Sequence, residues 1–173
     1  DMSENLGLSS QYLTFLIEDR VFAFEVLETR EVLSYLQPTP MPDAPEYVVG
    51  LVNVRGTALL VVDLRMKFGI APKPPTDDSA IIVLEQGSGA ERTMTGVLVD
   101  AVKGVIKIDN TMVELPPKMG DGTSFSHVLG IGKVAGDFVI ILRASSVITM
   151  HRLLFPEGIV HREASANRGS MQV

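Results

Sequence analysis

Apolar and polar residues alternate along much of the chain, a pattern typical of β-strands that bury one face. The segment Tyr-Leu-Thr-Phe-Leu-Ile at 12–17 is followed by a charged break at 18–20 and a second apolar run at 21–26. Two such runs around a short polar break predict a β-hairpin. Similar hairpins are predicted at 47–62, 80–99 and 128–142, with single strands at 30–36 and 102–108. We therefore expect a mainly β fold.

Helical signals are confined to two short segments. Residues 145–155 carry apolar side chains at helix-compatible spacing and are followed by Pro156, which predicts a C-terminal helix. Residues 63–68 predict one helical turn that ends at Gly69. Two proline-bearing stretches, 38–45 and 71–78, exclude regular elements, so we expect an ordered loop and a connector there.

The two halves of the chain show the same order of elements: a hairpin, a strand, a loop and a second hairpin. Residues 30–33 align with 103–106, and 49–56 align with 129–136, where two glycines keep the same separation. Five short strands with tight turns are best closed into a small barrel, because closure removes exposed strand edges. We predict two packed barrels, at about 20–78 and 79–143, with terminal strand and helix elements exchanged or packed at their interface.

The ends of the chain are expected to lie outside this domain. Residues 1–11 are predicted to be an N-terminal tail, and residues 156–173 a C-terminal tail. The C-terminal tail is expected to be disordered because its residues are small and polar.

The composition limits the classes of function. The chain has 173 residues, 46% of them apolar, a formal net charge of −6 and no cysteine. An acidic balance argues against nucleic acid as the main partner, and the lack of cysteine excludes disulfides and thiol catalysis. The apolar runs are far shorter than the roughly 18 residues of a membrane helix, and the first residues do not form a signal peptide. We therefore expect a cytoplasmic protein without direct membrane insertion.

Signals of catalysis or of a bound cofactor are weak. No G-x-S-x-G nucleophile elbow occurs, and all three histidines lie in the second half. His151 and His161 have no convergent third ligand, so we expect surface histidines and no metal site. Asp77 and Asp78 lie beside prolines in the connector, where solvated carboxylates are more common than catalytic ones. We expect neither an enzyme nor a cofactor.

Two motifs carry a resemblance to a known family. The segment Tyr-Val-Val-Gly-Leu-Val-Asn-Val-Arg-Gly at 47–56, with Val-Val-Asp-Leu at 61–64, resembles the G-x-x-N-x-R-G…V-x-D-L motif of the CheW family, the bacterial chemotaxis coupling proteins. The segment 96–105 resembles that family's G-x-x-V-D-x-V-x-x-V stretch. The similarity spans about residues 12–154. The motif positions expected to be structural are Gly50, Asn53, Gly56, Asp63, Gly96 and Asp100.

The resemblance implies a domain at 12–155 made of two SH3-like five-stranded β-barrels without catalytic activity. Proteins of this family join the cytoplasmic tips of transmembrane chemoreceptors to the histidine kinase CheA, whose CheW-like regulatory domain docks on the second barrel. By motif, the receptor-binding groove between the barrels would contain Val26 and Glu31 on one side and Val99 on the other. Arg55 would brace this groove by pairing with Glu31. The implied location is the cytoplasm, at membrane-associated receptor arrays.

Simpler interpretations stand beside these. An arginine at a hairpin turn, such as Arg55, is often merely solvated, and Val26 and Val99 suit a core as well as a groove. Leu60 and Arg143 depart from the family pattern, which usually has a proline and an acidic residue there. The fold also suits a scaffold for a non-flagellar chemosensory pathway without direct kinase activation, or a double barrel that binds a small ligand.

Overall fold

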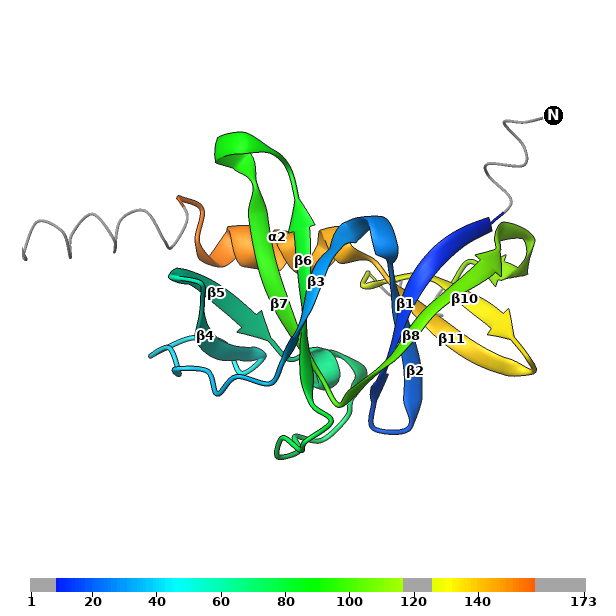
Figure 1. Ribbon diagram of the computed structural model, residues 1–173, viewed down its shortest axis with the longest axis horizontal. Coiled ribbons are helices and arrows are strands. Elements are labelled where there is room, and N and C mark those ends of the chain that lie inside the picture. The colour runs from blue at the N-terminus through cyan, green and yellow to red at the C-terminus, as the bar shows by residue number, and fades with distance from the viewer. Residues whose placement is uncertain (1–8, 117–125, 158–173) are drawn as a thin grey trace, which may run out of the picture.

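The structure is a computed structural model that describes residues 9–116 and 126–157. Two curled β-sheets lie side by side, and helix α2 packs along one of them (Figure 1). The strands are β1 Ser9–Ile17, β2 Arg20–Glu25, β3 Thr29–Ser34, β4 Val48–Val54, β5 Thr57–Val62, β6 Ala80–Gln86, β7 Thr93–Val99, β8 Ala101–Asp109, β9 Val113–Glu114, β10 Val128–Val134 and β11 Asp137–Leu142. The helices are the 3₁₀ segments η1 Val26–Glu28, η2 Leu64–Phe68, η3 Gly89–Glu91 and η4 Asn110–Met112, and the α-helix α2 Ala144–Leu154.

The strands form a six-stranded sheet in the order β8-β1-β2-β11-β10-β9 and a five-stranded sheet in the order β3-β6-β7-β5-β4. We name these the β1 sheet and the β3 sheet. Neighbouring strands are antiparallel except for β2–β11 and β5–β7, which are parallel and occupy matching places in the two sheets. Apart from the two-residue β9, the sheets therefore share one five-strand arrangement. The prediction of a mainly β fold with two packed five-stranded barrels and a C-terminal helix is confirmed, the barrels being the two curled sheets.

Each half of the chain gives its first hairpin to the other half's sheet. Strands β1 and β2 precede β3 in the chain but pair with β8 and β11. In the same way, β6 and β7 follow the connector but pair with β3 and β5. The predicted barrel boundary between residues 78 and 79 is thereby corrected, because the connector leads back into the sheet that the chain has just left. Composition marks a connector, but it does not reveal which strand will pair with the next one.

The core of the described residues forms three apolar clusters, of which the central one joins the two sheets. A central cluster takes residues from both sheets and from α2, among them Phe15, Phe24, Leu60, Ile82 and Val147. Smaller clusters lie in the β1 sheet, at Tyr12, Ala23, Ile108, Val139 and Ile141, and in the β3 sheet, at Val52, Leu59, Val61, Ile81 and Val83. Successive residues of β5 and β6 therefore face different clusters. Because both faces of these strands are buried, their sequences are continuous apolar runs.

Helix α2 and the turn η2 lie within one residue of their predicted positions, and η2 ends at Gly69 with a φ of 70°. His151 of α2 is not the surface residue that was expected. Its Nδ1 lies 2.7 Å from the Thr95 hydroxyl of β7, and burial lowers the pKa of its imidazole.

Within the described residues, no helix is both long enough and apolar enough to cross a bilayer.

The first described element is β1, which begins at Ser9. Residues 9–11, predicted as part of the N-terminal tail, pair with β8 instead. The rest of that tail, at 1–8, and most of the predicted C-terminal tail, at 158–173, lie outside the described residues, as does His161. So does the segment 117–125 of the polar stretch before β10.

Gly50 allows the proline-bearing loop to cross close to β4. Its φ is 146°, and a Cβ built there would lie 2.2 Å from the carbonyl oxygen of Thr39. Thr39 and Leu51 pair at this point through backbone hydrogen bonds of 2.8 and 2.9 Å. A side chain at position 50 would therefore displace the loop from the strand.

Replacing Gly50 with alanine should lower the free energy of unfolding by more than about 2 kcal/mol, because backbone strain adds to the clash with Thr39. Gly56→Ala is the matched control: its φ is 84°, but no atom lies within 4 Å of the added Cβ. Its loss should be about 1 kcal/mol, from backbone strain alone. Urea unfolding measures both losses, and equal values would contradict the close approach at Gly50.

Candidate partner-binding surface

The turn between β4 and β5 presents Arg55 at the rim of the β3 sheet. Arg55 and Gly56 have φ of 50° and 84°, as in the type I′ turn that suits two-residue hairpins. The backbone N–H of Gly56 donates to Asn53 Oδ1 at 2.8 Å, which fixes the turn. The matching turn in the β1 sheet has Ala135 in the place of Arg55, with φ of 51°. The turn therefore does not itself require an arginine.

Arg55 pairs with Glu31, as predicted. Its Nη2 donates to Glu31 Oε1. Glu31 lies on β3 and Arg55 follows β4, and these are the two edge strands of the β3 sheet, so the curl of the sheet brings them together. The side chains are 67% and 30% exposed, and so exposed a pair contributes only about 0–1 kcal/mol to stability.

The two valines predicted beside this pair have different surroundings. Val99, at the end of β7, is fully buried in the central cluster, so it offers no surface to a partner. The core interpretation is therefore correct for Val99, and its groove assignment is corrected. Val26 of η1 is partly buried and packs against the same cluster. Of the four predicted groove residues, the structure brings Glu31 and Arg55 into contact at the surface.

Exposed apolar side chains lie on the same segment as Glu31. Leu27 of η1 is 95% exposed, and Val32 and Leu36 are 44% and 41% exposed. Large exposed apolar side chains that gather on one segment are typical of a surface kept for a partner. Residues 27–36 thus carry both the charged Glu31 and exposed apolar side chains, although Val32 projects from the opposite side of β3 to Glu31 because successive strand residues alternate.

The motif glycine Gly96 has a packing role. It lies on β7 inside the β3 sheet's cluster, where an added Cβ would be 2.8 Å from Ile81 Cγ2 and 3.1 Å from Leu59 Cδ2. Only a residue without a side chain fits between these two groups. Gly50, Asn53 and Gly56 also have structural roles, as described above. Most of the motif positions are therefore explained by close packing and by turns.

The motif carboxylates Asp63 and Asp100 are joined by Arg65, whose side chain is only 2% exposed. Arg65 Nε donates to Asp63 Oδ2 at 2.9 Å, and Arg65 Nη2 donates to Asp100 Oδ1 at 2.5 Å. The other oxygen of Asp100 accepts the backbone N–H of Glu18 at 2.7 Å. Burial alone would raise the pKa of Asp100, but the hydrogen bonds from Glu18 and Arg65 hold it below its ordinary value. Asp100 therefore stays ionised beside the guanidinium of Arg65.

Arg65 was not among the residues singled out from the sequence. A signal for it existed, because Asp63 and Asp100 each directly follow an apolar strand, and a carboxylate at such a place needs a hydrogen-bonded or charged partner. Arg65 is the basic residue two positions after Asp63. Its contact with Asp100, 35 residues away, depends on the folded chain.

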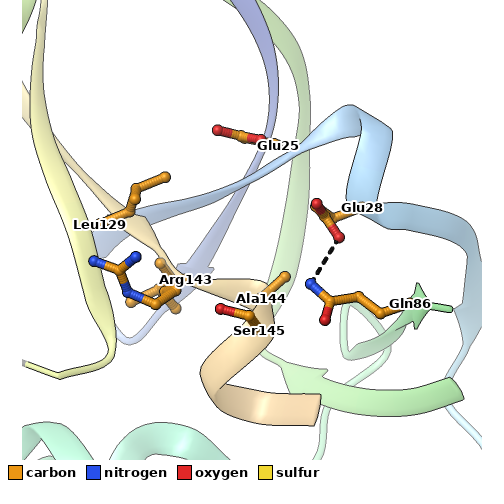
Figure 2. Close-up of a pocket in the computed structure, with 8 residues that line it drawn as sticks. Glu25, Glu28, Gln86, Leu129, Arg143, Ala144 and Ser145 are labelled. Atoms are coloured by element: carbon orange, nitrogen blue, oxygen red, sulfur yellow. Dashed lines mark hydrogen bonds between the residues drawn. The ribbon is translucent and has the colours of Figure 1, made fainter. Parts of the chain in front are cut away.

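A pocket of about 220 Å³ lies between the sheets at the start of α2 (Figure 2). Both sheets and α2 contribute to its lining, which consists of Glu25, Glu28, Gln86, Leu129, Leu142, Arg143, Ala144 and Ser145. On one side Gln86 Nε2 donates to Glu28 Oε2 at 3.0 Å, and Arg143 lies on the other side (Figure 2). None of the predicted groove residues lines this pocket, so the pocket and the Arg55–Glu31 pair are separate features.

Over residues 9–116 and 126–157, no group of three or more acidic or histidine side chains is placed to hold a metal.

Comparison with known proteins gives consistent matches. The CheW-like domain family matches residues 11–152. The chain is 28% identical over 137 residues to the chemotaxis protein CheW of Rhizobium meliloti, which covers 79% of this chain and 86% of the relative. It is 28% identical over 129 residues to protein FrzA of Myxococcus xanthus, which covers 69% of this chain and 78% of the relative.

A solved structure agrees with these matches. The scaffolding protein TtCheW from Thermoanaerobacter tengcongensis is similar with a TM-score of 0.69 and 30% sequence identity, over 79% of this chain and 90% of that one. The family match extends from β1 into α2 and so includes both sheets. With the motif residues in the places described above, this chain belongs to the CheW family.

Proposed function

We propose that this chain is a non-catalytic adaptor that couples chemoreceptors to the histidine kinase CheA. The observation that carries the proposal is the Arg55–Glu31 pair, which the motif residue Arg55 and Glu31 of β3 form at the surface although it adds little to stability. The fold brings these two charges together but gains little stability from them. Such a pair is suited to binding a partner. Membership of the CheW family supports the same role.

The proposed mechanism is geometric. The receptor tip would contact the Arg55–Glu31 pair and the exposed Leu27 of η1, and the regulatory domain of CheA would dock on the predicted second barrel, whose strands β8 to β11 lie in the β1 sheet. Arginine presents a planar fork of donors, so it can hold Glu31 and still offer donors to a partner. Holding both partners on one small protein raises their effective concentration for each other. The adaptor would then act in the cytoplasm, at membrane-associated receptor arrays.

Arg55→Ala should weaken receptor-stimulated autophosphorylation of CheA by about tenfold or more, because breaking a charge pair that an interface desolvates costs about 2–5 kcal/mol. The assay is a reconstitution of receptor vesicles, CheA and the adaptor, with phosphate transfer from labelled ATP as the readout. The free energy of unfolding should change by less than about 1 kcal/mol, because the pair is exposed in the free protein.

Arg30→Ala is the matched control for Arg55→Ala. Arg30 also lies on β3 and pairs with Glu85 at 2.7 Å, with side chains 44% and 24% exposed. Its removal should leave kinase coupling unchanged. Full coupling by Arg55→Ala would remove this residue from the receptor site. No binding of the unaltered protein to CheA at tens of micromolar would contradict the adaptor function itself.

The similarity to FrzA favours a second candidate, a scaffold for a non-flagellar chemosensory pathway that localises a kinase without activating it. The same reconstitution separates the two. An adaptor of the first kind raises kinase turnover when receptors are present, whereas a scaffold of the second kind binds both partners and leaves turnover unchanged.

A further inference from the structure

We propose that Arg65 and Asp100 are positioning residues that fix the orientation of the two sheets relative to each other. The structural part of this proposal stands on the contacts alone. Its consequence for signalling rests on the proposed function. That consequence is that a fixed orientation of the sheets is needed to hold receptor and kinase in a fixed position relative to each other.

The network lies where the chain crosses from one sheet to the other. Asp100 is the single residue between β7 of the β3 sheet and β8 of the β1 sheet. Asp63 and Arg65 follow β5 of the β3 sheet, and Glu18 lies in the turn between β1 and β2 of the β1 sheet. The Arg65–Asp100–Glu18 chain of hydrogen bonds therefore spans the junction between the sheets.

Asp100 is held on both sides of this junction. Its backbone N–H donates to the carbonyl oxygen of Leu16 at 2.9 Å, and one carboxylate oxygen accepts from the N–H of Glu18 at 2.7 Å. The other oxygen accepts from Arg65 Nη2. These bonds have defined directions, whereas the apolar contacts of the central cluster do not. The bonds can thus set an angle between the sheets that apolar packing alone would leave less defined.

Stability alone does not account for this arrangement. Ion pairs in protein interiors are often no more stabilising than apolar side chains of the same size, because desolvation offsets the attraction. Arg65 also keeps one donor group, Nη1, buried without a partner among the described residues. This buried network leaves one donor without a hydrogen bond within the described part of the chain. Its presence is therefore better explained by the relative orientation of the two sheets that it imposes than by a gain in stability.

The internal repeat provides a comparison within the molecule. The pocket in Figure 2 occupies the corresponding junction in the other half: Arg143 follows β11 as Asp63 follows β5, and η1 joins β2 to β3 as Asp100 joins β7 to β8. There, no ion pair joins Arg143 to Glu25 or Glu28 in the described part of the chain. One junction is therefore closed by a buried network while its counterpart is open.

The test measures the orientation directly. Because the chain has no cysteine, spin labels can be placed on Ser34→Cys in the β3 sheet and Asp137→Cys in the β1 sheet, both exposed positions. Pulsed electron paramagnetic resonance gives the distribution of distances between them. Asp100→Asn should widen this distribution about twofold, because it removes the charge-assisted bond across the junction. Receptor-stimulated CheA activity should fall severalfold at a temperature where the variant is folded.

Two controls separate positioning from stability. Asp63→Asn weakens an ion pair of Arg65 that stays within one segment, and Val61→Ala creates a cavity in the β3 sheet's own cluster. Both should lower the melting temperature and leave the distribution narrow. A narrow distribution in Asp100→Asn would overturn the proposal.

The two parts of the proposal fail in different ways. A wider distribution in Asp100→Asn with full kinase coupling would overturn the link to signalling and keep the structural part. Loss of coupling with a narrow distribution would overturn the structural part. If Asp100→Asn does not fold, Arg65→Lys replaces it, since lysine keeps the charge and loses the forked geometry.

Discussion

Replacing Arg65 with methionine should lower the free energy of unfolding by about 3–5 kcal/mol, because two carboxylates would remain largely buried without their cation. Asp63 and Asp100 have side chains only 15% and 14% exposed, so water cannot fully take the place of the guanidinium. Methionine fills most of the space of the arginine stem. The loss therefore reports the missing charge more than a cavity, and urea unfolding at pH 7 measures it.

The triple variant Arg65→Met, Asp63→Asn, Asp100→Asn is the control for this loss. Removing the charges from all three side chains leaves no buried ion, so much of the stability should return. A loss of less than about 1 kcal/mol in Arg65→Met would mean that the network behaves as an exposed pair and would contradict its burial.

Phe15→Ala should lower the free energy of unfolding by about 3–5 kcal/mol, because it removes a large buried side chain and leaves a cavity. Phe15 is fully buried in the central cluster, and its ring centroid lies 5.3 Å from that of Phe24 and 6.0 Å from that of Phe22. The cluster includes residues of both sheets. The variant should therefore destabilise both sheets together, in a single unfolding transition.

Phe138→Ala is the matched control, since Phe138 of β11 is 62% exposed and its removal should cost less than about 0.5 kcal/mol. Hydrogen exchange reports each sheet separately. In Phe15→Ala, the amides of β6 in the β3 sheet should lose as much protection as those of β1. Unchanged protection in β6 would show that the two sheets unfold independently and that the central cluster does not couple them.

Local elements of this fold can be predicted because their causes are local. The hairpins, the helix ended by Pro156 and the turn ended by Gly69 follow from apolar spacing and from the conformations that glycine and proline permit. The internal repeat was visible for the same reason. Each unit carries its own turn glycine, Gly56 or Gly136, at the same distance from a glycine inside the preceding strand.

What the sequence left undetermined depends on contacts between distant segments. Val99 and its neighbours form an apolar run that is equally compatible with a surface groove and a core, and only the arrangement of both sheets buries it. Arg65 lies two residues after Asp63 in the chain, but its contact with Asp100 requires β7 to lie next to β5. The Arg55–Glu31 pair was accessible only through the family resemblance, because it joins the two edges of a closed sheet.

The exchange of hairpins has a consequence for the independence of the two halves. Residues 9–62 supply β3, β4 and β5 of one sheet but not its central strands β6 and β7, and residues 80–142 lack β1 and β2 of the other. Neither half of the described chain therefore completes a sheet by itself. Separating the halves would leave β3 and β5 without β6 and β7, and β8 and β11 without β1 and β2, so the two sheets form one interlocked unit.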